Sequence, residues 1–189
     1  MAITLNGSGT VSGISAGGLP DGIIQSADLA TGVGGKILQV VQTVKTDTTS
    51  YNTIDTWADI SGMSVSITPS SASNKILVTA NANIGILQES YYIVRLEKGG
   101  TAIALGDGSG NRTQGYFGQR SPGHSEFIDN TVINFLDTAG STSAITYNLA
   151  WYLAYTSGST LYLNRCHYDA NQDYAPRMSS TITAMEVAA

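Results

Sequence analysis

Bulky apolar residues alternate with smaller or polar ones over the segment Ile-Thr-Tyr-Asn-Leu-Ala-Trp-Tyr-Leu-Ala-Tyr. A period of two places the bulky groups on one face of an extended chain. Those groups are Ile145, Tyr147, Leu149, Trp151, Leu153 and Tyr155. The pattern predicts a central β-strand with one buried face. Because a single strand cannot bury that face alone, we expect a second apolar sheet opposite it or a barrel closed around it.

The same alternation recurs along the rest of the body of the chain. A second core strand is predicted from an inward set of Ile76, Val78, Ala80, Ala82, Ile84 and Ile86. The segment 90–98 has Tyr92, Val94 and Leu96 on one face, and Met63, Val65 and Ile67 alternate with serines. Further strands are expected at residues 36–44, 53–60, 101–105, 127–138, 160–166 and 181–187.

We expect no convincing helix. About nine or ten short strands separated by Gly, Pro and Ser turns are typical of an all-β protein. We therefore predict an antiparallel, jelly-roll-like β-sandwich over residues 36–189. Residues 106–126 form its longest irregular stretch, which predicts either a functional loop or an insertion with short strands of its own.

Residues 1–35 differ in composition from the body. They hold nine of the 21 glycines and no Lys, Arg or aromatic residue, so the segment has too little apolar surface to fold alone. It is either a flexible leader or an extended Gly-rich arm that docks on a partner. The anchors of a docked arm would be its isolated apolar residues, Ile3, Leu5, Val11, Ile14, Leu19, Ile23, Ile24 and Leu29.

Charge and cysteine content exclude several classes of protein. The net charge is −5 and the pI is about 4.7, and the nine Lys and Arg occur singly, so we expect no nucleic-acid partner. A single cysteine, Cys166, allows no intrachain disulfide. We also expect neither a signal peptide nor a membrane span, and therefore synthesis in the cytoplasm.

Few residues in the sequence could form a catalytic or metal-binding site. Cys166 and His167 are adjacent, but neighbouring strand residues point to opposite faces, so they do not favour a nucleophile and its base. With two histidines in the chain, a histidine-based zinc site is hard to assemble. Asp107-Gly-Ser-Gly-Asn111 resembles the start of a calcium loop, but Arg112 replaces the required glycine. We expect no enzyme activity, no cofactor and no catalytic metal.

The polar loop before the last strand is the best candidate for a binding site. It contains acidic, amide and aromatic side chains, which together can hold a sugar by hydrogen bonds and ring stacking. The alternative is a solvated loop without a ligand. The residues concerned are Tyr168, Asp169, Asn171, Asp173 and Tyr174.

Three segments carry a resemblance to a known group. They are Gly7-Ser-Gly-Thr-Val-Ser-Gly-Ile-Ser-Ala-Gly-Gly-Leu-Pro-Asp-Gly with the following Ser26-Ala-Asp-Leu-Ala, then Ser66-Ile-Thr-Pro-Ser-Ser-Ala-Ser-Asn-Lys-Ile-Leu-Val, and the ending Ser180-Thr-Ile-Thr-Ala-Met-Glu-Val. Together they resemble small virion proteins of tailed bacteriophages of cyanobacteria and marine bacteria, usually described as tail-fibre proteins. Residues 106–126 match nothing in that group.

The resemblance implies a homotrimer of β-sandwich heads in the virion, attached through the amino-terminal arm to another virion protein. The low charge of the body, with aromatics such as Tyr91 and Tyr152 at nominally exposed positions, is compatible with a trimer contact. Outward loops would then contact the host surface, its glycans included. Tyr116, Phe117, Tyr168 and Tyr174 are the aromatic candidates for that contact.

Three functions follow as hypotheses. The first is a trimeric short tail fibre or adhesin. The second is a capsid decoration protein that clamps neighbouring capsid subunits, for which an extended arm would serve equally well. The third is a carbohydrate-active jelly-roll enzyme, which requires a cleft with paired carboxylates. Loss of glycan cleavage on changing Asp169 or Asp173 would support the third.

Overall fold

The computed structural model describes residues 4–5, 11–12, 36–86, 89–154 and 158–189. The chain divides into two compact units, Met1–Lys36 and Ile37–Ala189. In the first unit, β1 (Thr4–Leu5) pairs antiparallel with β2 (Val11–Ser12), and Leu5 lies opposite Val11. The other predicted anchors lie outside the described residues, namely Ile3, Ile14, Leu19, Ile23, Ile24 and Leu29.

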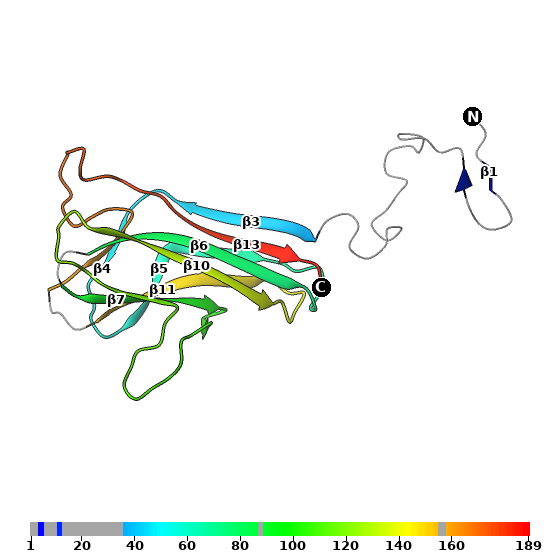
Figure 1. The fold of residues 1–189 in the computed structure, drawn as a ribbon, viewed down its shortest axis with the longest axis horizontal. Coiled ribbons are helices and arrows are strands. Elements are labelled where there is room, and N and C mark those ends of the chain that lie inside the picture. The colour runs from blue at the N-terminus through cyan, green and yellow to red at the C-terminus, as the bar shows by residue number, and fades with distance from the viewer. Residues whose placement is uncertain (1–3, 6–10, 13–35, 87–88, 155–157) are drawn as a thin grey trace. The chain divides into compact units, whose positions relative to one another are not determined.

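The described part of the second unit is built from strands and contains no helix, in agreement with the all-β prediction (Figure 1). In chain order the strands are β3 (Ile37–Lys45), β4 (Thr49–Tyr51), β5 (Trp57–Ile67), β6 (Lys75–Ile86), β7 (Tyr91–Lys98), β8 (Thr101–Ile103), β9 (Phe117–Arg120), β10 (Ile128–Thr138), β11 (Ile145–Ala154), β12 (Leu161–Leu163) and β13 (Ser180–Val187).

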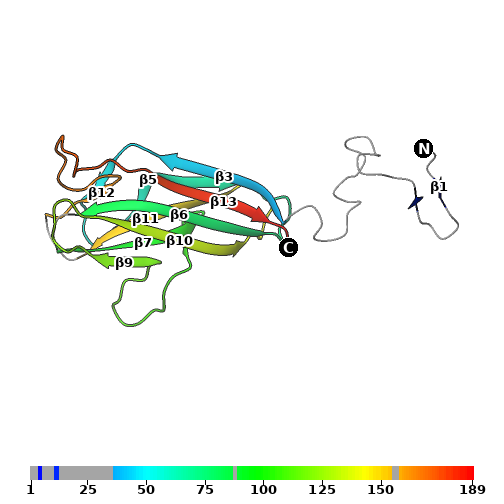
Figure 2. The ribbon, with the colours of Figure 1, turned by 45° about the horizontal axis from the view of Figure 1, so that its top comes forward.

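Two antiparallel sheets form this unit. In sheet I, β6 pairs with β10 along one edge, and its other edge is shared by β13 and then β12. Strand β3 flanks β13, and β4 flanks β12. In sheet II, the order is β5-β11-β7, and the free edge of β7 is shared by β8 and β9. The sheets are stacked face to face as two layers (Figure 2).

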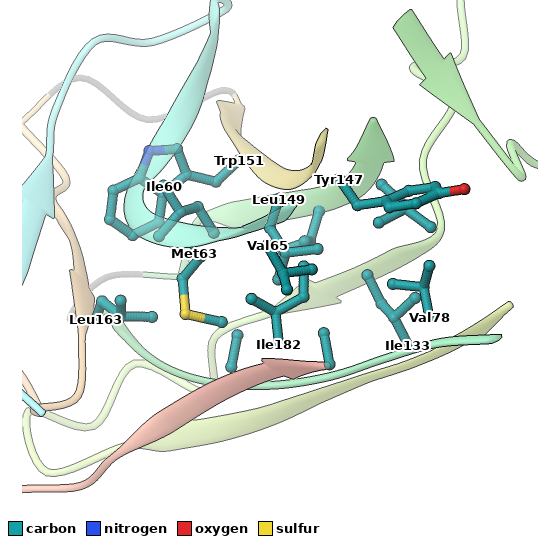
Figure 3. Packing of buried hydrophobic residues seen from close by; sticks show 14 of the residues in the cluster. Ile60, Met63, Val65, Val78, Ile133, Tyr147, Leu149, Trp151, Leu163 and Ile182 are labelled. Carbon is teal, nitrogen blue, oxygen red and sulfur yellow. The ribbon is translucent and has the colours of Figure 1, made fainter. Parts of the chain in front are cut away.

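The apolar core lies between the two sheets, as the alternation predicted. Fully buried side chains from sheet II, such as Leu149 and Tyr147, face Val78 and Ile182 of sheet I (Figure 3). Trp151 is 2% exposed and stacks on Tyr51, with 5.7 Å between ring centroids. Tyr155, the last residue of the predicted alternation, lies outside the described residues. The inward sets of β6 and β7 are also buried as predicted.

Strand β5 differs from the sequence prediction of two separate strands at 53–60 and 63–67. It begins at Trp57 and runs through Ile67, with a register shift against β11 between Asn148 and Ala150. Gly62 lies in this irregular part with a φ of +80°, a conformation that favours glycine. The bulge absorbs the change of phase, so Ile60 and Met63 both point into the core.

Other predicted strands also differ from the structure in their bounds or in their buried residues. The irregular stretch 106–126 contains a short strand, β9, which pairs with Tyr91–Val94 of β7. In β10, Ile133 is buried, whereas Val132 and Leu136 are about half exposed, at 47% and 55%. The strand predicted at 160–166 is reduced to three residues, because the chain leaves β6 after Leu163.

Candidate functional site

The 164–180 loop is closed at its base by a network around Asn164. This residue is fully buried and has a φ of +63°, which asparagine tolerates better than most residues. Ser180 Oγ donates to Asn164 Oδ1 at 2.6 Å, and the Met178 amide donates to the Asn164 carbonyl at 3.0 Å. Asn164 Nδ2 donates to the carbonyls of Lys45 and Asp47. Both ends of the loop are therefore fixed to each other and to sheet I.

Strand β6 supports the same base through Gly85. A Cβ at this position would lie 2.2 Å from the Arg165 carbonyl oxygen, so only glycine allows the loop backbone to approach so closely. Arg165 forms an isolated antiparallel bridge with Arg177. The Arg165 guanidinium lies over the Tyr162 ring at 3.8 Å and donates to the carbonyl of Cys166 at 3.0 Å. The two ends of the loop therefore run side by side where they leave the sandwich.

The tip of the loop presents two stacked tyrosines. The rings of Tyr168 and Tyr174 are 5.7 Å apart and nearly parallel, and their side chains are 38% and 53% exposed. A hydrogen bond with Tyr168 raises the pKa of Tyr174. The Tyr168 amide donates to the Ser125 carbonyl at 2.9 Å, which ties the tip to the segment before β10. The two rings form a flat, preformed surface.

Beside the tyrosines lies a polar hollow of about 350 Å³. Its lining consists of Asp169, Ala170, Asn171, Gln172, Ala175 and Arg177. The Asp169 carboxylate pairs with Arg177, and Arg165 Nη1 lies 3.7 Å from its other oxygen. A carboxylate, two amides and a guanidinium offer both donors and acceptors, which suits a hydroxyl-rich ligand. Asp173 is exposed but does not line this hollow.

Five of the sequence-predicted residues share the loop: Tyr168 stacks on Tyr174, Asp169 and Asn171 line the hollow, and Asp173 does neither. Tyr116 and Phe117 belong to a different place. Phe117 opens β9 and packs against Tyr92 with 6.1 Å between ring centroids. The Tyr116 hydroxyl donates to the Asn134 carbonyl and accepts from the Asn134 amide at 3.1 Å. Both rings are partly buried against the core.

A second, more apolar groove of about 490 Å³ lies on the outer side of sheet II. It is lined by Tyr91, Tyr92, Ile93, Arg112, Thr113, Gly118, Gln119, Arg120 and Ala154. Arg120 pairs with Glu89 and lies over the Tyr91 ring at 5.8 Å. The 106–116 loop borders the groove, and a Cβ at Gly115 would lie 2.2 Å from Ile93 Cγ2. Residues 106–126 were predicted as a candidate functional loop, but this groove was not predicted, because Arg112 and Arg120 are isolated in the sequence.

Sequence reasoning also missed a cluster on the outer face of sheet II. The Arg95 guanidinium lies over the Trp57 ring at 4.1 Å, and its Nη2 lies 2.6 Å from Glu97 Oε1. Asn148 Nδ2 donates to both Glu97 Oε2 and Asp59 Oδ1. The signal that could have found it is the alternation of Arg95 and Glu97 with the inward residues of β7.

The side chains of Cys166 and His167 contact two different tyrosines. Cys166 is 1% exposed and donates from Sγ to the Tyr168 carbonyl at 3.0 Å. His167 Nδ1 lies 3.2 Å from the Tyr162 hydroxyl. Among the described residues, no group of three or more His, Cys, Asp and Glu side chains is placed to hold a metal ion. None of the described segments forms a helix long and apolar enough to cross a membrane.

Comparisons with known proteins identify no family. No protein-family model matches the sequence, and no curated protein matches it.

Proposed function

We propose that this chain is a structural protein of a bacteriophage virion, a short homotrimeric tail fibre or adhesin. Its amino-terminal segment attaches to another virion protein, and its head contacts the host surface. The proposal begins from the resemblance of the segments at 7–30, 66–78 and 180–187 to such proteins. It does not involve an enzyme activity or a cofactor.

The observation that carries the proposal is the position and the construction of the 164–180 loop. Strand β3 begins at Ile37 beside Val187, at the end of the sandwich where the chain terminates. The 164–180 loop lies at the opposite end (Figures 1 and 2). A head held through the chain that precedes Ile37 would therefore present this loop away from its attachment. Its closed base and stacked tyrosines are already ordered, which lowers the entropy cost of binding.

The strand order supports the finer assignment of the head to the jelly-roll type. One sheet contains β3, β13, β6 and β10, and the other contains β5, β11, β7 and β9. Consecutive long strands therefore alternate between the sheets, so each sheet combines segments far apart in sequence. This interleaving is typical of double-sheet jelly rolls.

A host-surface glycan is the ligand that fits the loop best. Stacked aromatic rings pack on the apolar face of a sugar, and the groups of the adjoining hollow can bond its hydroxyls. The net charge of −5 and the scattered cations offer no phosphate-binding stripe, so nucleic acid is a poor fit.

Cryo-electron microscopy of the assembled particle tests the proposal. We expect density for this chain at the tail, with the heads pointing outward and the amino-terminal segments within a tail or adaptor protein. Density distributed over the capsid lattice, with those segments across subunit joints, would instead make the chain a decoration protein.

Binding of the purified full-length chain to host cells tests the role of the loop. Tyr174→Ala and Asn171→Ala should each weaken binding roughly tenfold, if each side chain contributes on the order of 1.4 kcal/mol. The matched control is Leu105→Ala, which removes a 39% exposed apolar side chain from the loop after β8. Equal loss in all three variants, or none, would count against the loop as the contact site.

A further inference from the structure

The outer face of sheet I carries a row of apolar side chains across its full width. Val40 lies opposite Met185, Met185 opposite Leu77, and Leu77 opposite Leu136. Directly opposed residues on neighbouring strands point to the same side of a sheet. Their neighbours Val78, Ala184 and Ile76 point into the core, so this row faces outward. Val40 and Leu136, at its two ends, are 56% and 55% exposed.

The rows that follow along the same face are uncharged. The next contains Gln42, Thr183, Thr79 and Asn134, and the one after it contains Val44, Thr181, Asn81 and Val132. Gln42 Nε2 donates to Thr183 Oγ1 at 2.8 Å, and Asn130 Nδ2 donates to Asn81 Oδ1 at 2.6 Å. Because Gln42, Thr183 and Asn81 already have hydrogen-bond partners, covering these three side chains would cost little desolvation energy.

The carboxylates of sheet I turn away from this face. Asp129 and Asp137 accept hydrogen bonds from the hydroxyls of Tyr92 and Tyr147, each at 2.7 Å, on the core side of the sheet. Glu186 is 1% exposed and accepts from Asn74 Nδ2 at 2.6 Å. Lys75, on the row next to the chain's C-terminus, donates to Thr138 at 2.7 Å. Among the described residues of the three rows, none carries a formal charge.

Charge decides which partner fits the face. Two copies of a chain with a net charge of −5 repel each other wherever their acidic groups meet. A face without carboxylates lets two copies approach closely and bury their exposed valines and leucines. A strongly charged partner would gain no matching charge here.

We propose that the outer face of sheet I is the surface through which copies of this chain contact one another. The assignment rests on the homo-oligomeric assembly in the proposed function and names the surface used. The row of Val40 and the exposed valines Val44 and Val132 form its apolar part, and the row of Gln42 lies between them.

Sedimentation of the purified full-length chain tests the assignment. We expect the wild type to be oligomeric at micromolar concentration. Leu136→Asp and Val40→Asp should sediment as folded monomers, because each buries a carboxylate at the contact and weakens association by roughly a hundredfold or more. The matched control, Leu105→Asp, changes a 39% exposed leucine in the loop after β8 and should remain oligomeric. A monomeric wild type would overturn the assignment.

An oligomer that persists in both sheet I variants would also overturn the assignment, but would leave the proposed assembly intact. Localisation in the virion is measured separately by microscopy, so failure of the proposed function can be told apart from failure of this surface.

Thiol labelling gives an independent answer if an aspartate variant fails to fold. Leu136→Cys in the oligomer should react with N-ethylmaleimide at least about tenfold more slowly than Leu105→Cys. The native Cys166 contributes little background, since it is buried. Equal labelling rates at the two positions would rule out a covered face.

Discussion

The outer faces of the two sheets differ in their side chains, although both sheets are antiparallel. On sheet I, Val40 and Leu136 are exposed and the carboxylates of Asp129, Asp137 and Glu186 turn inward. On sheet II, Arg95 and Glu97 point outward and are held by Trp57 and Asn148. The first face has apolar groups without cover, and the second has charged groups that are already paired. The difference supports the proposal that sheet I is completed by another molecule, whereas the charged cluster of sheet II is completed by its own neighbouring side chains.

This comparison requires that both faces rest on one shared core, and replacing Trp151 tests that requirement. Trp151→Ala should lower the free energy of unfolding by about 3–5 kcal/mol, because it removes a buried ring and leaves a cavity beside Tyr51. Urea denaturation followed by circular dichroism measures the loss. Trp151→Phe is the matched control. It should cost less, since the Trp151 Nε1 donor has no hydrogen-bond partner to lose. A negligible effect of the alanine variant would mean that the ring is not part of the core.

Glu186 tests whether the inward carboxylates of sheet I stabilise the fold. Burial acts to raise its pKa, but hydrogen bonds from Asn74, Gln39 and Ser70 outweigh burial and lower the pKa to about 2. The charged form therefore stabilises the folded chain fully above pH about 4.5, and that stabilisation is lost as the pH falls toward 2.

Glu186→Gln should lower the free energy of unfolding at pH 7 by roughly 2–3 kcal/mol, because it weakens several charge-assisted hydrogen bonds. It should also flatten the decline of stability between pH 4.5 and pH 2. Chemical denaturation at a series of pH values provides both readings. Asp173→Asn, at an exposed position, should change neither. An unchanged pH profile in Glu186→Gln would contradict the assigned role.

Glu97 tests whether the sheet II cluster is held by its own pairing. Glu97 is 5% exposed, and its removal leaves Arg95 without its carboxylate partner and Asn148 with Asp59 as its remaining acceptor. Glu97→Ala should cost about 2 kcal/mol in unfolding free energy, and Arg95→Ala combined with Glu97→Ala should cost less than the sum of the single changes. Additive costs in the double-mutant cycle would show that the two side chains do not stabilise each other.

Replacing Leu136 should have the smallest effect on the free energy of unfolding, in contrast to replacing Glu97. Leu136→Ser removes a half-exposed side chain, and in dilute, monomeric protein it should change the free energy of unfolding by less than about 0.5 kcal/mol. Denaturation at two protein concentrations provides the measurement. A loss of stability confined to the higher concentration would be due to weakened association. A loss of equal size at both would mean that the side chain belongs to the core of the single chain.

Much of the fold could be predicted from local pattern. Alternation located the inward faces of β6, β7 and β11, because a buried sheet face imposes a period of two on any sequence that forms it. It also located the inward set Met63, Val65 and Ile67, but it did not predict that the bulge at Gly62 joins this set to residues 57–60 in one strand, β5. It missed β9, because a four-residue strand is too short for a pattern. Composition separated the first 35 residues from the body, close to the division after Lys36.

The candidate site could be predicted only in part. Tyr168, Asp169, Asn171 and Tyr174 were predicted from their chemistry within one loop, since neighbours in sequence stay close in space. Arg165 and Arg177 were missed, although they lie near the two ends of that loop and form the bridge between them. Tyr116 and Phe117 were placed in an irregular stretch, whereas pairing with β7 draws them against the core.

The sequence by itself determined the class of fold, the inward faces of the long strands and the polar loop, because each depends on residues within a few positions of one another. Only the tertiary structure decided which side chains meet across strands. Val40 and Met185, for example, are 145 positions apart in the sequence. The register of the paired strands aligns them with Leu77 and Leu136 in one row. The closure of the 164–180 loop by Asn164 depends likewise on distant backbone atoms of β3 and β6. Such contacts have no local signal, because strand pairing between remote segments is set by the packing of the whole sandwich.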